Sequence, residues 1–340
     1  MQAALLLLLS AVAGCPKEPG DYEAKIEVCG EKRKYLFHLP PCYDGCRRLP
    51  VVFVFHGMSA NAKLVQKFSE MDETADKFGF ITIYPEGTGF SVFKAFKAGG
   101  STMANAQDKP DDVAFVNAIL NDIERGLCVD CDRVYATGLS NGAMMCHRLA
   151  VELSHRITAI APISGTLGTD LCPPKCPIPI MQFQGTCDEV LPIDGPQEKG
   201  LFSIQTFYPL AQTMQFYASA AGCKAEPHIT QLPDCYDDGT TVRLHEYVDC
   251  MPGIEVILVE ICGGGHQWPR HGLPFRYLGV TSEEIDANEM MWCFFQRHTL
   301  SERGCHCGCV QCQAAAAKVK GKSQPLTARL TDEEAAPVRR

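Results

Sequence analysis

Ser140 lies in the pentapeptide GLSNG (138–142), where a β-rich run gives way to a helical pattern. The run at 134–137 favours a strand, and apolar side chains recur at helical spacing after Gly142. Glycines on both sides of the serine let the backbone turn sharply, so the hydroxyl is left exposed at the end of the strand. The motif therefore predicts a nucleophile for acyl transfer. Taken alone, it also fits an ordinary strand-to-helix turn with a capping serine.

A serine hydroxyl is a poor nucleophile at neutral pH. It needs a base that takes its proton and a carboxylate that orients the base. Where this motif is catalytic, an Asp or Glu and then a His follow the serine, on loops after later strands. Asp188 comes shortly after the apolar run 178–184, and His266 follows the run 254–261 and a stretch of glycines. We expect His266 to be the base and Asp188 to orient it.

Neighbouring residues compete for these two roles. Glu189 and Asp194 are rivals for the acid, and Asp188 also fits a simple turn residue. His271 is the rival base, but it lacks the glycine hinge that precedes His266.

An ester hydrolase also needs N–H donors for the oxyanion that develops on the carbonyl. One donor is expected to be the backbone N–H of Asn141, which follows the serine. The loop after the run 51–55 supplies the other, the backbone N–H of Met58. His56 in that loop is expected to support it rather than to act as a base. Trp268, two residues after the predicted base, fits equally a wall of the substrate pocket and an aromatic that packs its own loop.

Strands and helices that could position these residues alternate along the chain. Continuous apolar runs are typical of strands buried on both faces of a parallel sheet, here at 51–55, 80–84, 133–137, 157–163, 178–184 and 254–261. Helical patterns occur between and after them, one opening at Asp111 and others at 210–220 and 285–295. This alternation predicts a doubly wound, mostly parallel α/β fold that ends near His298.

The composition of the chain limits which classes of function are possible. The chain of 340 residues has a formal net charge of −9 and no basic stripe, which argues against nucleic-acid binding. A hydrophobic content of 46% is enough for a sizeable core. No segment after the N-terminus is long and apolar enough to predict a transmembrane helix.

The N-terminus and the cysteines indicate export. Residues 1–14 are expected to be a signal peptide, with an apolar run and an A-x-A cleavage site at 11–13. Cys15 also fits a bacterial lipobox, which would leave the protein lipid-anchored. Nineteen cysteines are unusual for a cytosolic enzyme and predict disulfides. We expect Cys146 to be a free buried thiol and Cys223–Cys250 to be a loop staple.

The predicted esterase domain spans residues 15–300, and a separate tail follows at 301–340. The tail opens with four clustered cysteines, for which disulfides are favoured over zinc because the paired C-x-x-C spacing of common zinc sites is missing: Cys305, Cys307, Cys309 and Cys312. The residues after them are polar, poor in aromatics and expected to be disordered.

Seven segments, in this order, resemble the polyhydroxybutyrate depolymerase and feruloyl esterase family of secreted esterases: VVFVFHGMSANA, DDVAFVNAILNDIE, RVYATGLSNGAMMCHRLA, AIAPISG, QGTCDEVLPIDG, GGGHQWP and IDANEMMWCFFQRH. The resemblance implies an α/β-hydrolase fold with helices on both faces of the sheet. It implies ester hydrolysis with no metal or organic cofactor. It also carries the triad onto Ser140, Asp188 and His266.

The expected function is that of a secreted serine esterase. Its expected substrate is a feruloylated or acetylated polysaccharide or a hydroxyalkanoate polyester, with a preference for the polysaccharide ester. Three alternatives stay open: a catalytically silent binding protein of the same fold, a serine peptidase of that fold, and a tail that carries the function as a metal-binding appendage.

Overall fold

The computed structural model describes residues 18–90, 93–99, 110–168, 176–196 and 206–303. The predicted signal peptide, Cys15 and the cysteine cluster of the tail lie outside the described residues. Within them, no helix is long and apolar enough to cross a membrane.

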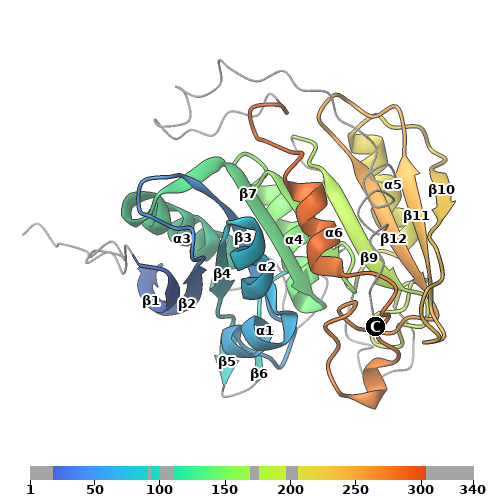
Figure 1. Cartoon of the computed structure of the whole chain (residues 1–340), viewed down its shortest axis with the longest axis horizontal. Coiled ribbons are helices and arrows are strands. Elements are labelled where there is room, and N and C mark those ends of the chain that lie inside the picture. The colour runs from blue at the N-terminus through green and yellow to red at the C-terminus, as the bar shows by residue number, and fades with distance from the viewer. Residues whose placement is uncertain (1–17, 91–92, 100–109, 169–175, 197–205, 304–340) are drawn as a thin grey trace, which may run out of the picture.

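A ten-stranded sheet runs through the molecule in the order β1-β2-β4-β3-β7-β8-β9-β12-β11-β10 (Figure 1). The six strands from β4 to β12 in that order are parallel, and antiparallel strands flank them on both sides. All six parallel strands coincide with the apolar runs, so the predicted sheet is confirmed. The strands of this sheet are β1 (Gly20–Val28), β2 (Glu31–Leu39), β3 (Leu49–Phe55), β4 (Ile81–Pro85), β7 (Val129–Leu139), β8 (Ala159–Ile163), β9 (Ile180–Gly185), β10 (His228–Gln231), β11 (Thr241–Tyr247) and β12 (Val256–Cys262).

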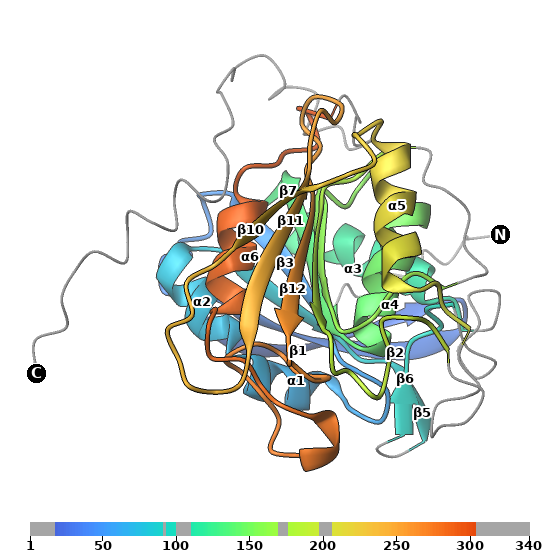
Figure 2. The same ribbon diagram turned by 90° about the vertical axis from the view of Figure 1, so that its right-hand side faces the viewer.

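Helices cover both faces of the sheet (Figure 2). Side chains from α3, α4 and α5 share one core cluster with one face of β3, and side chains from α1, α2 and α6 share a second cluster with its other face. The alternation is plain in β3, where Phe53 and Phe55 enter the first cluster and Val52 and Val54 the second. The helices are α1 (Ala62–Ser69), α2 (Met71–Phe78), α3 (Asp112–Gly126), α4 (Asn141–Glu152), α5 (Leu210–Ala220) and α6 (Ala287–Phe295).

Side-chain caps explain where two of the predicted helices begin. Asp111 accepts hydrogen bonds from the first free N–H groups of α3, and Asp286 does the same for α6. After α6 the chain still packs on the domain, since the Leu300 N–H bonds to Asp132 O. The packed part of the chain therefore extends at least to Leu300.

The sheet edges and a small hairpin were not predicted. β1 and β2 form a hairpin whose turn residues, Cys29 and Gly30, both have positive φ. A second hairpin, β5 (Thr88–Phe90) with β6 (Phe93–Ala95), lies outside the main sheet and projects from the lower edge in Figure 1.

Two of the cysteine predictions are confirmed. A disulfide joins Cys223, after α5, to Cys250, in the turn between β11 and β12. Cys146 is a free thiol buried in α4, and its burial raises the pKa of the thiol well above the usual value.

Candidate active site

Ser140 occupies the turn between β7 and α4. Its φ of 61° and ψ of −119° lie outside the regions that non-glycine residues favour. The Ser140 N–H bonds to Ile163 O at the end of β8, 3.0 Å away, which ties the turn to the neighbouring strand. Such strain at the end of a strand is the geometry expected of a nucleophile elbow.

Glycines around Ser140 are required by close backbone packing. A Cβ at Gly142 would lie 2.2 Å from Phe55 O, and one at Gly138 would lie 2.6 Å from the same oxygen. A Cβ at Gly165 would lie 2.5 Å from Ser140 O. The elbow therefore fits against β3 and the loop after β8 only because these positions carry no side chain.

Replacing Gly142 with alanine is expected to destabilise the fold by about 3 kcal/mol, because the added methyl meets a backbone carbonyl that cannot move aside. Urea unfolding measures the loss. Gly57→Ala is the control, since its added Cβ would lie 3.4 Å from Leu139 O, an ordinary contact. Equal stability of the Gly142 variant and wild type would contradict the close packing.

His266 and Asp188 form a buried pair. The His266 Nδ1 lies 2.7 Å from Asp188 Oδ2, and their side chains are 4% and 0% exposed. Asp188 Oδ1 accepts hydrogen bonds from the N–H groups of Val190 (2.9 Å) and Leu191 (2.8 Å), and Oδ2 also accepts one from Gln184 Nε2 (3.1 Å). A carboxylate with both oxygens bonded in this way holds the imidazole in one orientation and leaves its Nε2 for proton transfer.

Hydrogen bonds between the loops after β9 and β12 bring this pair together. Cys187 N–H bonds to Gly264 O (2.9 Å), and Thr186 bonds through its N–H to Ile261 O and through Oγ1 to the Gly263 N–H. A Cβ at Gly185 would lie 2.4 Å from Gly264 O, so the two loops also pack backbone to backbone.

The rival acid and base residues lie elsewhere. Glu189 and Asp194 are exposed and have no hydrogen bond to His266. His271 lies 3.1 Å from Glu70 and 3.5 Å from Asp286. Burial lowers the pKa of His271, but these carboxylates outweigh it and raise the pKa above the usual value. His271 is thus held in an ion-paired cluster.

The strand order places Ser140 at the same edge as this pair. β7, β8, β9 and β12 are parallel neighbours, so the residues that follow them emerge together. In the described part of the chain no hydrogen bond joins Ser140 Oγ to His266. Nucleophile–base hydrogen bonds are often long in enzymes without substrate and tighten when it binds.

Two backbone N–H groups beside Ser140 are candidates for the oxyanion. Asn141 is the first residue of α4, where N–H groups have no partner within the helix and the helix dipole favours negative charge. The loop that carries Met58 lies close to Ser140. Met58 follows Gly57, and a Cβ built on Gly57 would lie 3.5 Å from the Ser140 Cβ. No described residue accepts a hydrogen bond from the Met58 N–H.

His56 holds the Met58 loop, as predicted. Its Nε2 accepts the Gly87 N–H at 2.9 Å, so its Nδ1–H donates to Gly57 O at 2.7 Å. Burial lowers the pKa of His56 to about 4, and the ring is neutral near pH 7. Both ring nitrogens are engaged with backbone groups, which leaves no part for His56 as the base.

Trp268 packs inside the protein, which favours the loop-packing role among the two predicted ones. Its side chain is fully buried, packs edge-on against Phe68 and donates from Nε1 to Asn288 Oδ1 at 2.8 Å. The Asn288 amide in turn bonds to Ser69 O. Trp268 therefore anchors the loop of His266 to α1 and α6.

Sequence reasoning missed two side chains that hold the site. The amide side chain of Asn141 bonds to both the N–H and the C=O of Phe96, at 2.7 and 3.1 Å, and fixes the segment after β6 against the elbow. Gln184 is buried at the end of β9 and bonds to Asp188. An amide at the end of a buried strand was the available signal, because buried polar groups require partners.

Replacing Gln184 with leucine is expected to lower kcat by about tenfold to a hundredfold, because a hydrogen bond to a charged group contributes about 1.5 to 3 kcal/mol. Steady-state kinetics on a small ester measure it. Gln182→Leu is the control, since Gln182 is equally buried on the same strand and has no hydrogen bond to Asp188. An equal loss in both variants would mean that the effect is structural.

The parallel sheet with helices on both faces, and a strained serine at the turn from β7 to α4, is the α/β-hydrolase fold. A solved structure, the acetyl xylan esterase from Aspergillus awamori, matches with a TM-score of 0.54 at 13% identity, over 81% of this chain and 99% of that one. At this identity the match supports the fold alone.

Sequence comparisons find related esterases. The sequence model described as "Esterase PHB depolymerase" matches residues 33–197. A protein of Nocardia uniformis subsp. tsuyamanensis named "Putative esterase NocK" is 27% identical over 77% of this chain and 78% of its own. Feruloyl esterase B of Piromyces equi is 28% identical over 69% of this chain, which spans only 42% of that protein. These matches support the polyhydroxybutyrate depolymerase and feruloyl esterase family for this sequence, and the chain is a carboxylic ester hydrolase.

Proposed function

We propose that the chain is an exported serine esterase that acts through Ser140, His266 and Asp188 by way of an acyl-enzyme. The observation that carries the proposal is the buried His266–Asp188 pair, held 2.7 Å apart at the same sheet edge as the strained Ser140.

In the first step Ser140 Oγ attacks the carbonyl carbon of the ester while His266 Nε2 takes the hydroxyl proton. Asp188 stabilises the imidazolium that forms. The backbone N–H groups of Met58 and Asn141 bind the oxyanion, which is more negative than the carbonyl of the substrate and so gains more from them.

The intermediate then collapses. His266 gives its proton to the alkoxide oxygen, the bond between the acyl carbon and that oxygen breaks, and the alcohol leaves. Water attacks the acyl-enzyme with His266 again as the base, and the acid product and free Ser140 are released. No step requires a group other than the residues named and water.

For the substrate we propose a feruloylated or acetylated polysaccharide. The feruloyl esterase named among the relatives supports the aryl ester, while the polyester named by the family description is the competing substrate. Initial rates on methyl ferulate and on a soluble 3-hydroxybutyrate oligomer decide between them. Faster cleavage of methyl ferulate is expected, whereas cleavage of the hydroxybutyrate oligomer alone would contradict the proposal.

For export we propose a signal peptide at 1–14, an esterase domain at 15–300 and a tail at 301–340. The disulfide between Cys223 and Cys250 supports an oxidising compartment. N-terminal sequencing of the exported protein checks this, with an unmodified Cys15 expected within the first two residues. A lipid on Cys15 would contradict release as a free protein.

A further inference from the structure

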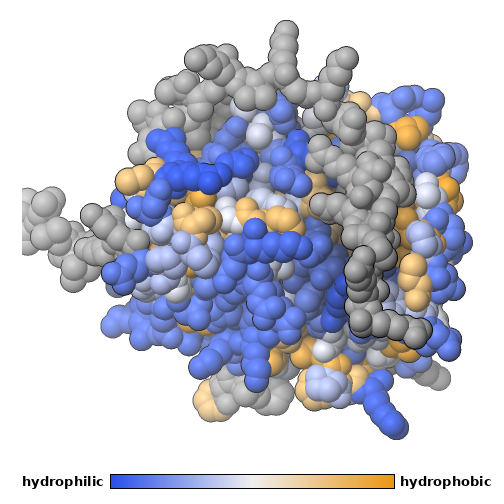
Figure 3. Space-filling model, in the orientation of Figure 1, coloured by the Kyte–Doolittle hydropathy of each residue, from blue (hydrophilic) through white to orange (hydrophobic). Residues whose placement is uncertain are grey.

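The loop that follows His266 exposes apolar side chains although it is firmly held. Residues 273–280, here named the aromatic loop, include the short 3-10 helix η1 (Arg276–Leu278). Phe275 is 46% exposed, Tyr277 66% and Val280 44%. The rings of Phe275 and Tyr277 stack with their centroids 5.7 Å apart. Figure 3 shows a few hydrophobic residues among hydrophilic ones at the lower edge of the molecule.

The aromatic loop is attached directly to the predicted base. The His266 N–H bonds to Leu278 O, and the Gly265 N–H bonds to Val280 O at 2.9 Å. The Gln267 side chain closes the loop, since it bonds to both the N–H and the C=O of Leu273 at 2.9 Å. A loop fixed in this way loses little entropy when something binds to its exposed rings.

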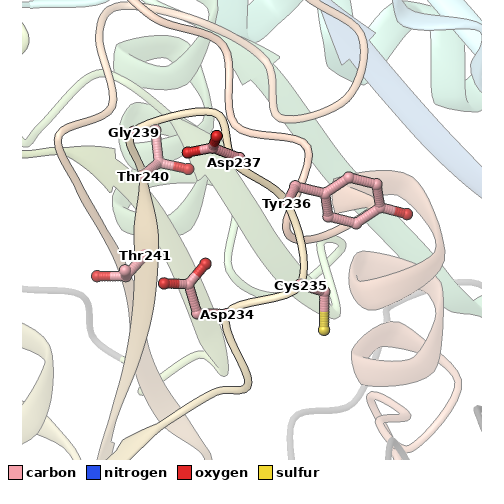
Figure 4. A pocket seen from close by; sticks show the side chains of 7 residues that line it. All are labelled: Asp234, Cys235, Tyr236, Asp237, Gly239, Thr240 and Thr241. Atoms are coloured by element: carbon pink, nitrogen blue, oxygen red, sulfur yellow. The ribbon is translucent and has the colours of Figure 1, made fainter.

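A polar hollow lies next to the chain that leaves the aromatic loop. It measures about 390 Å³, and its lining includes Asp234, Asp237 and Thr241 (Figure 4). It is formed by the segment that enters β11, which pairs antiparallel with β12, so the hollow lies at the sheet edge where β12 ends. Hydrogen bonds from Thr240 Oγ1 to Ser282 Oγ and from the Glu283 N–H to Asp238 fix the hollow to the chain just beyond the aromatic loop.

We propose that the aromatic loop and this hollow form a subsite for a neutral polysaccharide chain that carries the ester. The proposal rests on the proposed esterase function. A sugar ring offers an apolar C–H face that packs on an aromatic ring, as on Phe275 or Tyr277, and a rim of hydroxyl donors. The carboxylates of Asp234 and Asp237 accept hydrogen bonds from such hydroxyls, and these are charge-assisted.

The same chemistry disfavours the competing polymer. A hydroxyalkanoate polyester offers ester oxygens, which only accept hydrogen bonds, so it gives the carboxylates of the hollow no donor. An acidic polysaccharide is disfavoured because the chain carries a net charge of −9 and the hollow itself is acidic. A neutral saccharide chain fits both the rings and the carboxylates.

Affinity electrophoresis of the full chain in gels that contain soluble, unesterified xylan tests the subsite without catalysis. The Phe275→Ala/Tyr277→Ala double variant and the Asp234→Ala/Asp237→Ala double variant are compared with wild type. Met251→Ala is the matched control, an exposed apolar side chain in the turn between β11 and β12 at the opposite edge of the sheet. Binding to poly(3-hydroxybutyrate) particles is measured in parallel.

We expect xylan to retard wild type and the control, and the dissociation constant to rise at least fivefold in both double variants. The kcat/KM on feruloylated xylan should fall by more than that on methyl ferulate, mainly through KM. Unchanged retardation in the double variants, no retardation of wild type, or binding of wild type to the polyester alone would overturn the subsite. A wild type that binds xylan but cleaves no ester would refute the proposed function and leave the subsite standing.

Discussion

Replacing Ser140 with alanine should lower kcat by about 10⁴-fold to 10⁶-fold on every ester that the wild type cleaves, because no other hydroxyl can take its place at the elbow. The residual rate should remain above that in water, since the Met58 and Asn141 N–H groups still stabilise the oxyanion. Single-turnover kinetics on a chromogenic ester measure the loss directly.

Ser164 provides the matched control for this variant. It follows β8 as Ser140 follows β7, has a φ of 49°, and its buried hydroxyl makes no hydrogen bond in the described structure. Ser164→Ala should keep kcat within about threefold, because the substitution removes a hydroxyl that has no partner to lose. Wild-type activity in Ser140→Ala, or a comparable loss in Ser164→Ala, would contradict the role given to Ser140.

Asp188→Asn should lower kcat by about 10⁴-fold with little change in the fold. The N–H groups of Val190 and Leu191 require an acceptor at the position of Asp188 Oδ1, so the new amide oxygen takes that place. Its NH₂ then faces His266 Nδ1. This arrangement favours the His266 tautomer with the proton on Nε2, which cannot accept the proton of Ser140.

Asp194→Asn is the control for this prediction and also tests a rival acid. Asp194 is exposed in the same loop, and its replacement should change kcat less than twofold. Circular dichroism and thermal unfolding verify that both variants fold. A large loss in the Asp194 variant, or a small one in the Asp188 variant, would move the acid to another residue.

Much of the fold could be predicted because the central strands are buried on both faces. The run Val51–Phe55 has no polar residue and Ile254–Ile261 has only two, Glu255 and Glu260, and they coincide with β3 and β12. The outer strand β10 is short and mostly exposed, so its pattern is weak. β1 alternates strictly between polar and apolar residues, a pattern that a search for continuous apolar runs passes over. The hairpin of β5 and β6 has strands of three residues, too short for any periodicity.

The residues of the candidate site were likewise predictable only in part. Ser140, Asp188 and His266 could be proposed because each follows a strand whose end the sequence marks. The burial of Trp268 could not be predicted, since a tryptophan beside a base looks the same whether it lines a pocket or packs a loop. Gln184 went unnoticed because its role arises only when the loops after β9 and β12 meet in space.

The most direct test of the central claim is to trap the acyl-enzyme. Wild type is mixed with a chromogenic ferulate ester, quenched in acid within milliseconds and digested, and mass spectrometry locates the acyl group. The account predicts the feruloyl mass on the peptide that contains Ser140, with a burst of alcohol equal to the enzyme concentration when deacylation is the slower step. Rapid hydrolysis with the acyl group on another residue, or with no adduct under conditions that show a burst, would contradict it.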